Sequence, residues 1–141
     1  MILQRTTDTY VGMYDFAVTG GAVGSYDLQI PVPNNTVVTE FAVQLAVVPT
    51  GGVGATISFD RIQTDVSPNV TTVGLFIAAT ALAGFGAAVG TVTYGRYPGG
   101  AAPTFNPFTM TMSISIGMSI AVAALTAGKI KIFMRGITFD F

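Results

Sequence analysis

FTMTMSISIGMSI, from Phe108 to Ile120, decides the fold class of this 141-residue chain. Every even-numbered position in the stretch is apolar, and every odd-numbered position is Thr, Ser or Gly. Side chains of a β-strand alternate between two faces, whereas a helix would scatter these apolar residues around its circumference. We therefore predict a long, half-buried strand. Its apolar face packs on a core, and its outer face carries hydroxyl groups: Thr109, Thr111, Ser113, Ser115 and Ser119.

The sequence that follows predicts a turn and a second amphipathic strand. LTAGK, Leu125 to Lys129, contains a glycine that can adopt the backbone conformations of a tight turn. After it, one face carries Ile130, Ile132 and Met134, and the other carries Lys129, Lys131 and Arg135. Beyond Gly136 the apolar positions shift by one residue, to Ile137, Phe139 and Phe141. A glycine at such a shift predicts a β-bulge or a strand that crosses between sheets.

Shorter segments with the same alternation lie upstream, separated by turns rich in Gly, Pro and Asn. They cover residues 26–32, 41–47, 57–59 and 92–94. In total we expect seven or eight short strands and little helix. This pattern predicts an all-β fold, an antiparallel β-sandwich for which a jelly roll is the most suitable topology. We expect one domain over residues 1–141, with the less regular residues 1–22 as an N-terminal arm.

One stretch departs from the pattern, because no charged residue occurs between Asp65 and Arg96. Its centre, GLFIAATALAGFGAAVG (Gly74–Gly90), approaches the length of a membrane span. Its glycines and phenylalanines also give it a composition like that of a fusion peptide. Much of it is Ala, Gly and Thr, however, and the strand at 92–94 follows directly. We favour a short strand or helix over residues 73–83 and then a small-residue linker. Such a segment needs cover from this subunit or a neighbour.

The composition excludes several kinds of chemistry. The chain has no Cys, His or Trp, so disulfides, Cys/His metal sites and imidazole catalysis are ruled out. Its six basic and seven acidic residues are scattered, and no basic patch predicts a nucleic-acid partner. Asp60 and Asp65 are the candidates for a two-carboxylate glycosidase site, but their spacing does not mark an acid–base pair. We therefore predict no enzymatic activity, no cofactor and no metal.

From Ser25 onward the chain resembles a family of small phage structural proteins. The resemblance rests on YDLQIPVPNNTVV (26–38), FAVQLAVVPTGGVGATISF (41–59), GLFIAATALAG (74–84), the alternating Thr/Ser strand and ALTAGKIKIFM (124–134). These features are similar to those of capsid decoration (cement) and head-fibre proteins. The resemblance implies a β-sandwich or jelly roll on the virion, and it transfers no catalytic residue.

The resemblance also implies partners and a location. We expect a homo-oligomer, with a trimer as the expected state, that sits on the capsid surface and bridges major capsid proteins. The N-terminal MILQRTTDTY lacks the apolar region of a secretory signal, which predicts synthesis in the host cytoplasm. The candidate interface residues are Tyr10, Tyr14, Phe16, Leu75, Phe76, Phe85, Tyr97, Phe105 and Phe108.

Two alternatives remain. A β-sandwich binding module of a head fibre or tail would recognise a host surface or glycan, and an exposed cluster of Tyr94, Tyr97 and Asp60 would support it. A membrane-active protein is the second and less favoured alternative.

Overall fold

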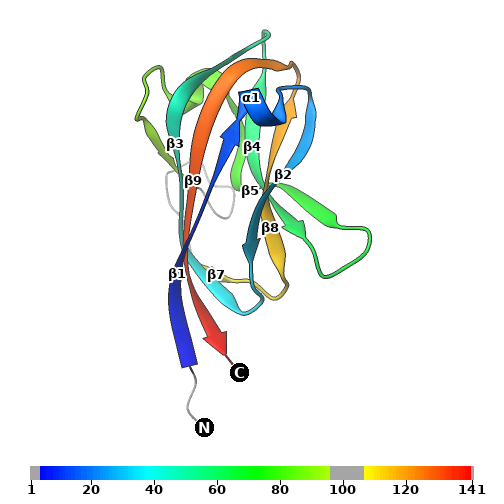
Figure 1. Cartoon of the computed structure of the whole chain (residues 1–141). Coiled ribbons are helices and arrows are strands. Elements are labelled where there is room, and N and C mark those ends of the chain that lie inside the picture. Colours follow the sequence, from blue (N-terminus) through cyan, green and yellow to red (C-terminus); the bar gives the residue numbers. More distant parts are fainter. Residues whose placement is uncertain (1–3, 96–106, 141) are drawn as a thin grey trace.

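The computed structural model describes residues 4–95 and 107–140, which form two antiparallel sheets packed face to face (Figure 1). Sheet A contains, in spatial order, β1 (Gln4–Asp15), β9 (Leu125–Asp140), β3 (Thr36–Gly51) and β6 (Val92–Tyr94), and β7 (Phe108–Thr109) also pairs with β3. Sheet B contains β2 (Gly24–Val32), β8 (Ile114–Ala121), β4 (Thr56–Gln63) and β5 (Val70–Ala81).

This strand order is that of a jelly roll. The first long strand pairs with the last, β2 pairs with β8, and most connections carry the chain from one sheet to the other. The predicted all-β antiparallel sandwich is therefore confirmed. Helix within the described residues is limited to α1 (Phe16–Thr19) and the 3₁₀ turn η1 (Leu82–Phe85). The carboxylate of Asp15 caps α1 by accepting a hydrogen bond from the N–H of Ala17 at 3.0 Å.

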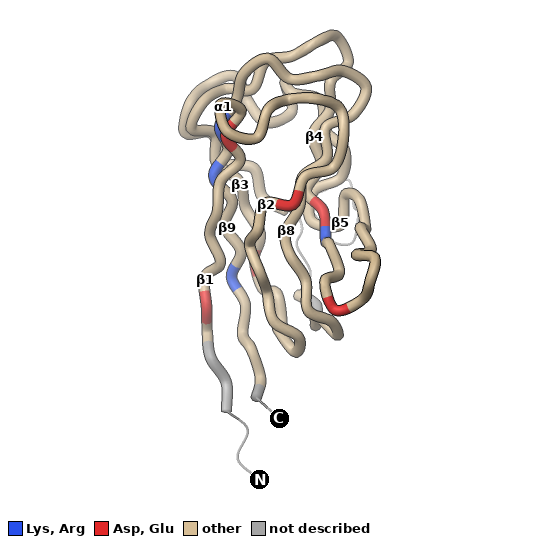
Figure 2. The backbone as a smooth tube through the Cα atoms, turned by 45° about the vertical axis from the view of Figure 1, so that its right-hand side comes forward, with Lys and Arg blue, Asp and Glu red and all other residues tan. Residues whose placement is uncertain are grey.

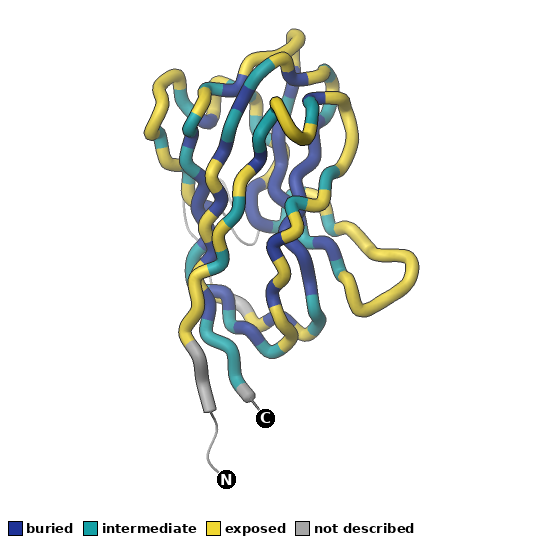
Figure 3. Tube along the Cα trace, in the orientation of Figure 1, coloured by how far each residue is buried: buried dark blue, intermediate teal, exposed yellow. Residues whose placement is uncertain are grey.

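The core lies between the sheets, and buried residues recur along the strands of both sheets (Figure 3). Sheet A contributes Phe41 from β3 and Ile130, Ile132 and Met134 from β9, and sheet B contributes the isoleucines and Met118 of β8. Aromatic rings join the layers: Phe41 stacks on Phe76 with centroids 4.8 Å apart. Phe59 meets Phe85 edge to face at 6.3 Å.

The stretch from Phe108 to Ile120 forms two strands rather than one. β7 belongs to sheet A and β8 to sheet B, and residues 110–113 carry the chain between them. The predicted burial of Met110, Ile114, Ile116, Met118 and Ile120 is correct. The predicted outer row of hydroxyls is wrong, because the two strands lie in different sheets. Its members Ser115 and Ser119 are themselves buried on sheet B.

The structure also corrects two sequence-based predictions near the C-terminus. The chain turns at residues 122–124, so LTAGK already belongs to β9. Gly128 there permits a close approach instead of a turn, since an added Cβ would lie 3.2 Å from the Cα of Pro49. At Gly136, β9 stays in register with β1. The extra residue is Thr39 of β3, which lies between the pairs Val38–Gly136 and Glu40–Arg135. The predicted bulge therefore lies on the partner strand.

The expected N-terminal arm and the uncharged stretch both contribute strands to the sandwich. Residues 4–15 of the expected arm form β1, at the edge of sheet A. The uncharged stretch begins as β5 and continues into η1, with Phe76, Ile77 and Phe85 buried. None of the helices in the described part of the chain has the length and apolarity needed to cross a membrane.

Candidate docking face

The outer face of sheet A carries a row of apolar side chains that crosses β1, β9, β3 and β6. Val11 on β1 lies opposite Phe133 on β9, Phe133 lies opposite Ala42 on β3, and Ala42 lies opposite Tyr94 on β6. The exposed fraction is 61% for Val11, 37% for Phe133 and 54% for Tyr94. Outward positions of an antiparallel sandwich are usually polar. We call these four residues the apolar row.

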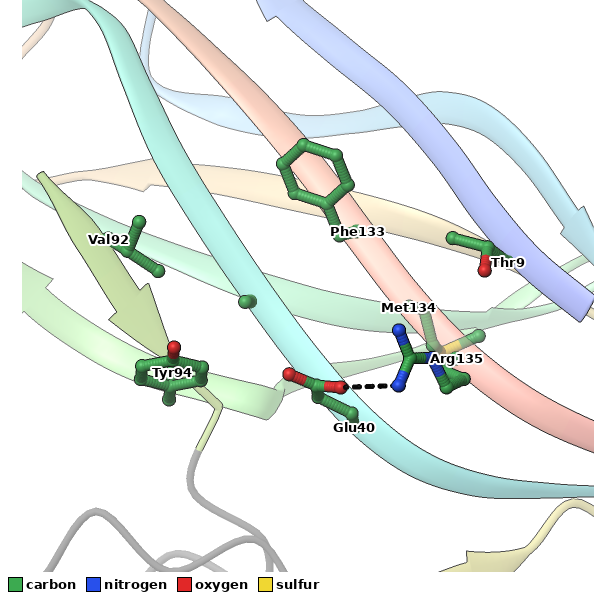
Figure 4. A pocket seen from close by; sticks show the side chains of 8 residues that line it. Thr9, Glu40, Val92, Tyr94, Phe133, Met134 and Arg135 are labelled. Atoms are coloured by element: carbon green, nitrogen blue, oxygen red, sulfur yellow. Dashed lines mark ion pairs between the residues drawn. The ribbon is translucent and has the colours of Figure 1, made fainter. Parts of the chain in front are cut away.

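Exposed neighbours widen the apolar row at both ends. Met13 is two residues after Val11 on β1, and Val92 is two residues before Tyr94 on β6, so both lie on the same outer face. Both side chains are exposed. Phe133 separates two shallow hollows. One, of about 220 Å³, is lined by residues including Glu40, Tyr94, Phe133 and Arg135 (Figure 4). The other, of about 310 Å³, is lined by Val11, Met13, Lys131 and Phe133, with Gly12. The apolar row, Met13, Val92 and Lys131 together form what we call the docking face.

Charged residues are sparse along the chain (Figure 2), and those on sheet A include two ion pairs. Lys129 pairs with Asp15 at 3.5 Å, and Arg135 pairs with Glu40 at 3.6 Å. Both pairs are partly exposed, so each contributes little to stability. Lys131 lies between Met13 and Gln44, and no carboxylate in the described part of the chain pairs with it. The docking face therefore combines apolar area with one unpaired positive charge.

The outer face of sheet B is different, because its polar groups bind one another. Asp60 is 1% exposed, and its carboxylate accepts hydrogen bonds from the Ser58 hydroxyl at 2.8 Å, the Gly74 N–H at 2.9 Å and the Ser119 hydroxyl. Asp27 accepts from the Ser115 hydroxyl and from the Gln29 N–H. These hydrogen bonds lie within sheet B and stabilise its strands.

The structure gives no support to a carboxylate pair at Asp60 and Asp65. Asp60 is enclosed in mid-strand by the three donors, whereas Asp65 lies beyond the end of β4 and accepts from Gln63 and the Ser113 N–H. Among the described residues, no group of three or more acidic side chains is placed to hold a metal ion.

The interface residues expected from sequence fall into three groups. Tyr14, Phe76 and Phe85 are fully buried in the core of this subunit, so they present no surface to a partner. Tyr10, Phe16 and Leu75 are partly buried against the same core and keep some exposed surface. Phe108 begins β7, and Tyr97 and Phe105 lie outside the described residues.

Tyr14 has a structural role that its sequence position did not suggest. Its hydroxyl donates a hydrogen bond to the carbonyl oxygen of Gly20 at 2.7 Å and so holds the chain after α1. Burial, followed by the nearby Tyr26 and Asp15, raises the pKa of Tyr14 to about 12. The phenol therefore stays protonated as a donor well above neutral pH.

Sequence reasoning missed the docking face. Phe133 interrupts the outward row of Lys129, Lys131 and Arg135 on β9, and this was the available signal. Val11 and Met13 were not identified because β1 was expected to be an arm. The cluster expected for a glycan-binding module does not form: Tyr94 lies on sheet A, Asp60 is buried in sheet B, and Tyr97 is outside the described residues.

The chain is thus a jelly-roll sandwich with exposed apolar side chains on sheet A, and comparison with solved structures finds the same fold in phage capsids. One similar chain comes from the acidic stable capsid of Helicobacter pylori bacteriophage KHP30, with a TM-score of 0.59, 13% identity, and 99% of each chain covered. A chain of the cyanophage Pam1 capsid asymmetric unit gives a TM-score of 0.61 at 12% identity, covering 95% of this chain and 86% of that one.

A third similar chain comes from the capsid of Ralstonia phage GP4, with a TM-score of 0.57, 14% identity, and 96% of this chain and 84% of that chain covered. At these identities the likeness establishes the fold. No protein-family model and no curated protein sequence gives a significant match to the chain.

Proposed function

We propose that this chain is a structural protein of a phage virion, and more specifically a capsid decoration protein. Its copies form a homo-oligomer, with a trimer as the expected state, and bridge major capsid proteins on the outer surface of the shell. The proposal includes no catalytic step, since the chain lacks His and Cys and its buried carboxylate is fully hydrogen-bonded.

One observation carries the proposal: three chains from phage capsid structures share the fold over at least 95% of this chain. Coverage of the other chains is also high, from 84% to 99%. The KHP30 capsid chain therefore has about the same length as this one. The likeness is to small, whole capsid chains and not to one domain of a much larger shell protein.

The docking face supplies the physical means of attachment. Burial of apolar area contributes about 25 cal/mol per Å², and lost translational and rotational freedom offsets part of that gain. Many copies bound to one shell convert modest single contacts into durable attachment, because each contact is held in place by its neighbours. Lys131 favours a capsid surface that presents a carboxylate beside an apolar patch.

The test is quantification of the protein in purified native particles. We expect it to co-purify with filled capsids in a copy number comparable to that of the major capsid protein, and cryo-electron microscopy to place the sandwich on the outer surface. Absence from particles, or a few copies at the tail tip alone, would overturn the decoration role.

A further inference from the structure

The four sheet edges of this sandwich differ in how well they are protected from pairing with another strand. An unprotected edge strand is a template for association, and proteins block such edges with bulges, prolines or short strands. On sheet B, β2 contains Pro31 and an irregularity between Asp27 and Ile30, and β5 has two irregularities against β4. On sheet A, β6 has three residues. Three of the four edges are therefore protected from pairing with another strand.

The fourth edge, β1, has none of these features. Its twelve residues contain no proline, and its register with β9 runs unbroken from Gln4–Asp140 to Asp15–Lys129. Within the described residues, no strand pairs with the other side of β1. A long run of backbone N–H and C=O groups is therefore available on the outer side of β1.

We propose that β1 pairs antiparallel with β1 of a second copy, about a two-fold axis that passes through Tyr10 perpendicular to sheet A. Residues opposite each other in a sheet share a face, so only registers that pair odd positions with odd positions keep the two outer faces continuous. In the register centred on Tyr10, Thr9 lies opposite the partner's Val11, and Asp8 lies opposite the partner's Gly12.

Charge complementarity selects this register. It places Arg5 opposite the partner's Asp15 at both ends of the contact, and it brings no like charges face to face. A register centred on Thr9 would put Arg5 opposite the partner's Met13, and one centred on Asp8 would put the two Asp8 carboxylates together. A register centred on Val11 would leave Arg5 beyond the end of the partner's strand.

Pairing of this kind extends the docking face as well as the sheet. The A sheets of the two copies become one continuous sheet. The two apolar rows approach each other at the axis, where Val11 of each copy lies opposite Thr9 of the other. A two-fold contact relates two copies only, so it doubles the assembly and leaves the other sides of each subunit free. The pairing does not depend on the proposed function, and it is expected of the purified chain.

Introduction of like charges on the edge tests the pairing. Thr9→Lys with Val11→Lys places lysines opposite each other twice across the axis, at two exposed outward positions. By size-exclusion chromatography with light scattering, the wild-type mass should be twice that of this variant. Thr71→Lys with Val73→Lys, an equal change on the exposed residues of β5, should leave the mass unchanged. Equal masses for wild type and the β1 variant, or a monomeric wild type, would overturn the proposal.

Cysteine pairing tests the register, because the chain has no cysteine of its own. Residues that face each other across strands have Cα atoms about 4.5–5.5 Å apart, within the range for a disulfide, whereas diagonal neighbours are about 7–8 Å apart. Oxidation of a mixture of Thr9→Cys and Val11→Cys chains should therefore give linked dimers that neither variant gives alone. A mixture of Thr7→Cys and Val11→Cys chains should not. Linkage in the second mixture and not in the first would refute the register centred on Tyr10.

Discussion

The carboxylate of Asp60 on β4 accepts a hydrogen bond from the hydroxyl of Ser119 on the neighbouring strand β8, although Asp60 is 1% exposed. A buried charge is costly unless donors replace the lost water, and Ser58 and the Gly74 N–H supply two more donors here. The network joins β4, β8 and the irregular part of β5. It explains how a carboxylate can be buried in mid-strand on sheet B, because all three donors come from this subunit.

Replacement of Asp60 by Asn should destabilise the chain. The amide keeps the size of the carboxylate, but its NH₂ group donates where the carboxylate oxygen accepts, so one of the three donors loses its acceptor. We expect a loss of about 1–3 kcal/mol in the free energy of unfolding, measured by urea titration. The matched control is Asp8→Asn at an exposed position, which should change the stability by less than about 0.5 kcal/mol. Equal stabilities for the two variants would contradict the structural role of Asp60.

Phe76 should behave as a core residue. It is fully buried and stacks on Phe41 with the ring planes 10° apart. Phe76→Ala should therefore lower the free energy of unfolding by about 3–5 kcal/mol, because it leaves a cavity in the core. Its neighbour Leu75 is partly exposed, and Leu75→Ala should cost clearly less. If Phe76→Ala instead kept its stability and lost oligomers, Phe76 would be an interface residue after all.

The case of Phe76 shows what the sequence could predict. Local alternation indicated most strands, the apolar face of β9 and the all-β class, because strand periodicity is a property of neighbouring residues. Burial of Phe76 depends on Phe41, 35 positions earlier in the chain, and no local pattern reports such a contact. For the same reason, the alternation of residues 108–120 could not show that the chain changes sheets at residues 110–113.

The docking face was harder to predict than the core. Its four-residue row is assembled from β1, β9, β3 and β6, which come from both ends and the middle of the chain. Each strand contributes one or two outward apolar residues, and a single exposed apolar residue is unremarkable in a sequence. Only the registers of three strand pairs bring them into one row.

Because of Tyr14, the free energy of unfolding should fall as the pH rises in the alkaline range. The pKa of the folded phenol is raised to about 12 from the ordinary tyrosine value of 10.0, so the folded chain retains a proton that the unfolded chain releases. The contribution is complete below pH 10 and is lost as the pH rises from about 10 to 12. Urea midpoints measured across this range should fall with pH.

Tyr14→Phe provides the control for this titration. The variant lacks the ionisable group and should show a smaller fall in stability between pH 10 and 12. It should also be less stable than wild type at neutral pH, because the Gly20 carbonyl loses its donor. An unchanged alkaline slope in the variant would assign the effect to other tyrosines.

Polar substitution of the docking face should weaken attachment without unfolding the chain. Phe133→Ser with Tyr94→Ser removes the two exposed rings of the apolar row. If sheet A faces the capsid, particles assembled with this variant should carry fewer copies, measured by mass spectrometry of purified virions. Val53→Ser with Val89→Ser is the matched control, since both valines are exposed outside the strands. Full occupancy by the ring variant would exclude this face as the capsid contact.

Gly117 should tolerate no larger side chain unless Ile62 is shortened. It lies on β8 between Asp60 of β4 and Asp27 of β2, and Ile62 folds over it. A Cβ on residue 117 would lie 2.6 Å from the Cδ1 of Ile62 and 3.0 Å from the carbonyl oxygen of Tyr26. Gly117→Ala should therefore cost about 1–3 kcal/mol in the free energy of unfolding.

The second variant, Ile62→Val, removes the Cδ1 atom that causes the closest contact. In the Gly117→Ala background it should restore part of the lost stability, although alone it costs about 0.5–1.5 kcal/mol. The double-mutant cycle should thus give a favourable coupling energy between positions 62 and 117, measured by urea unfolding of the four chains. Additive costs would mean that the Tyr26 carbonyl, and not Ile62, sets the limit. The backbone spacing between β2 and β8 would then be the reason that residue 117 is glycine.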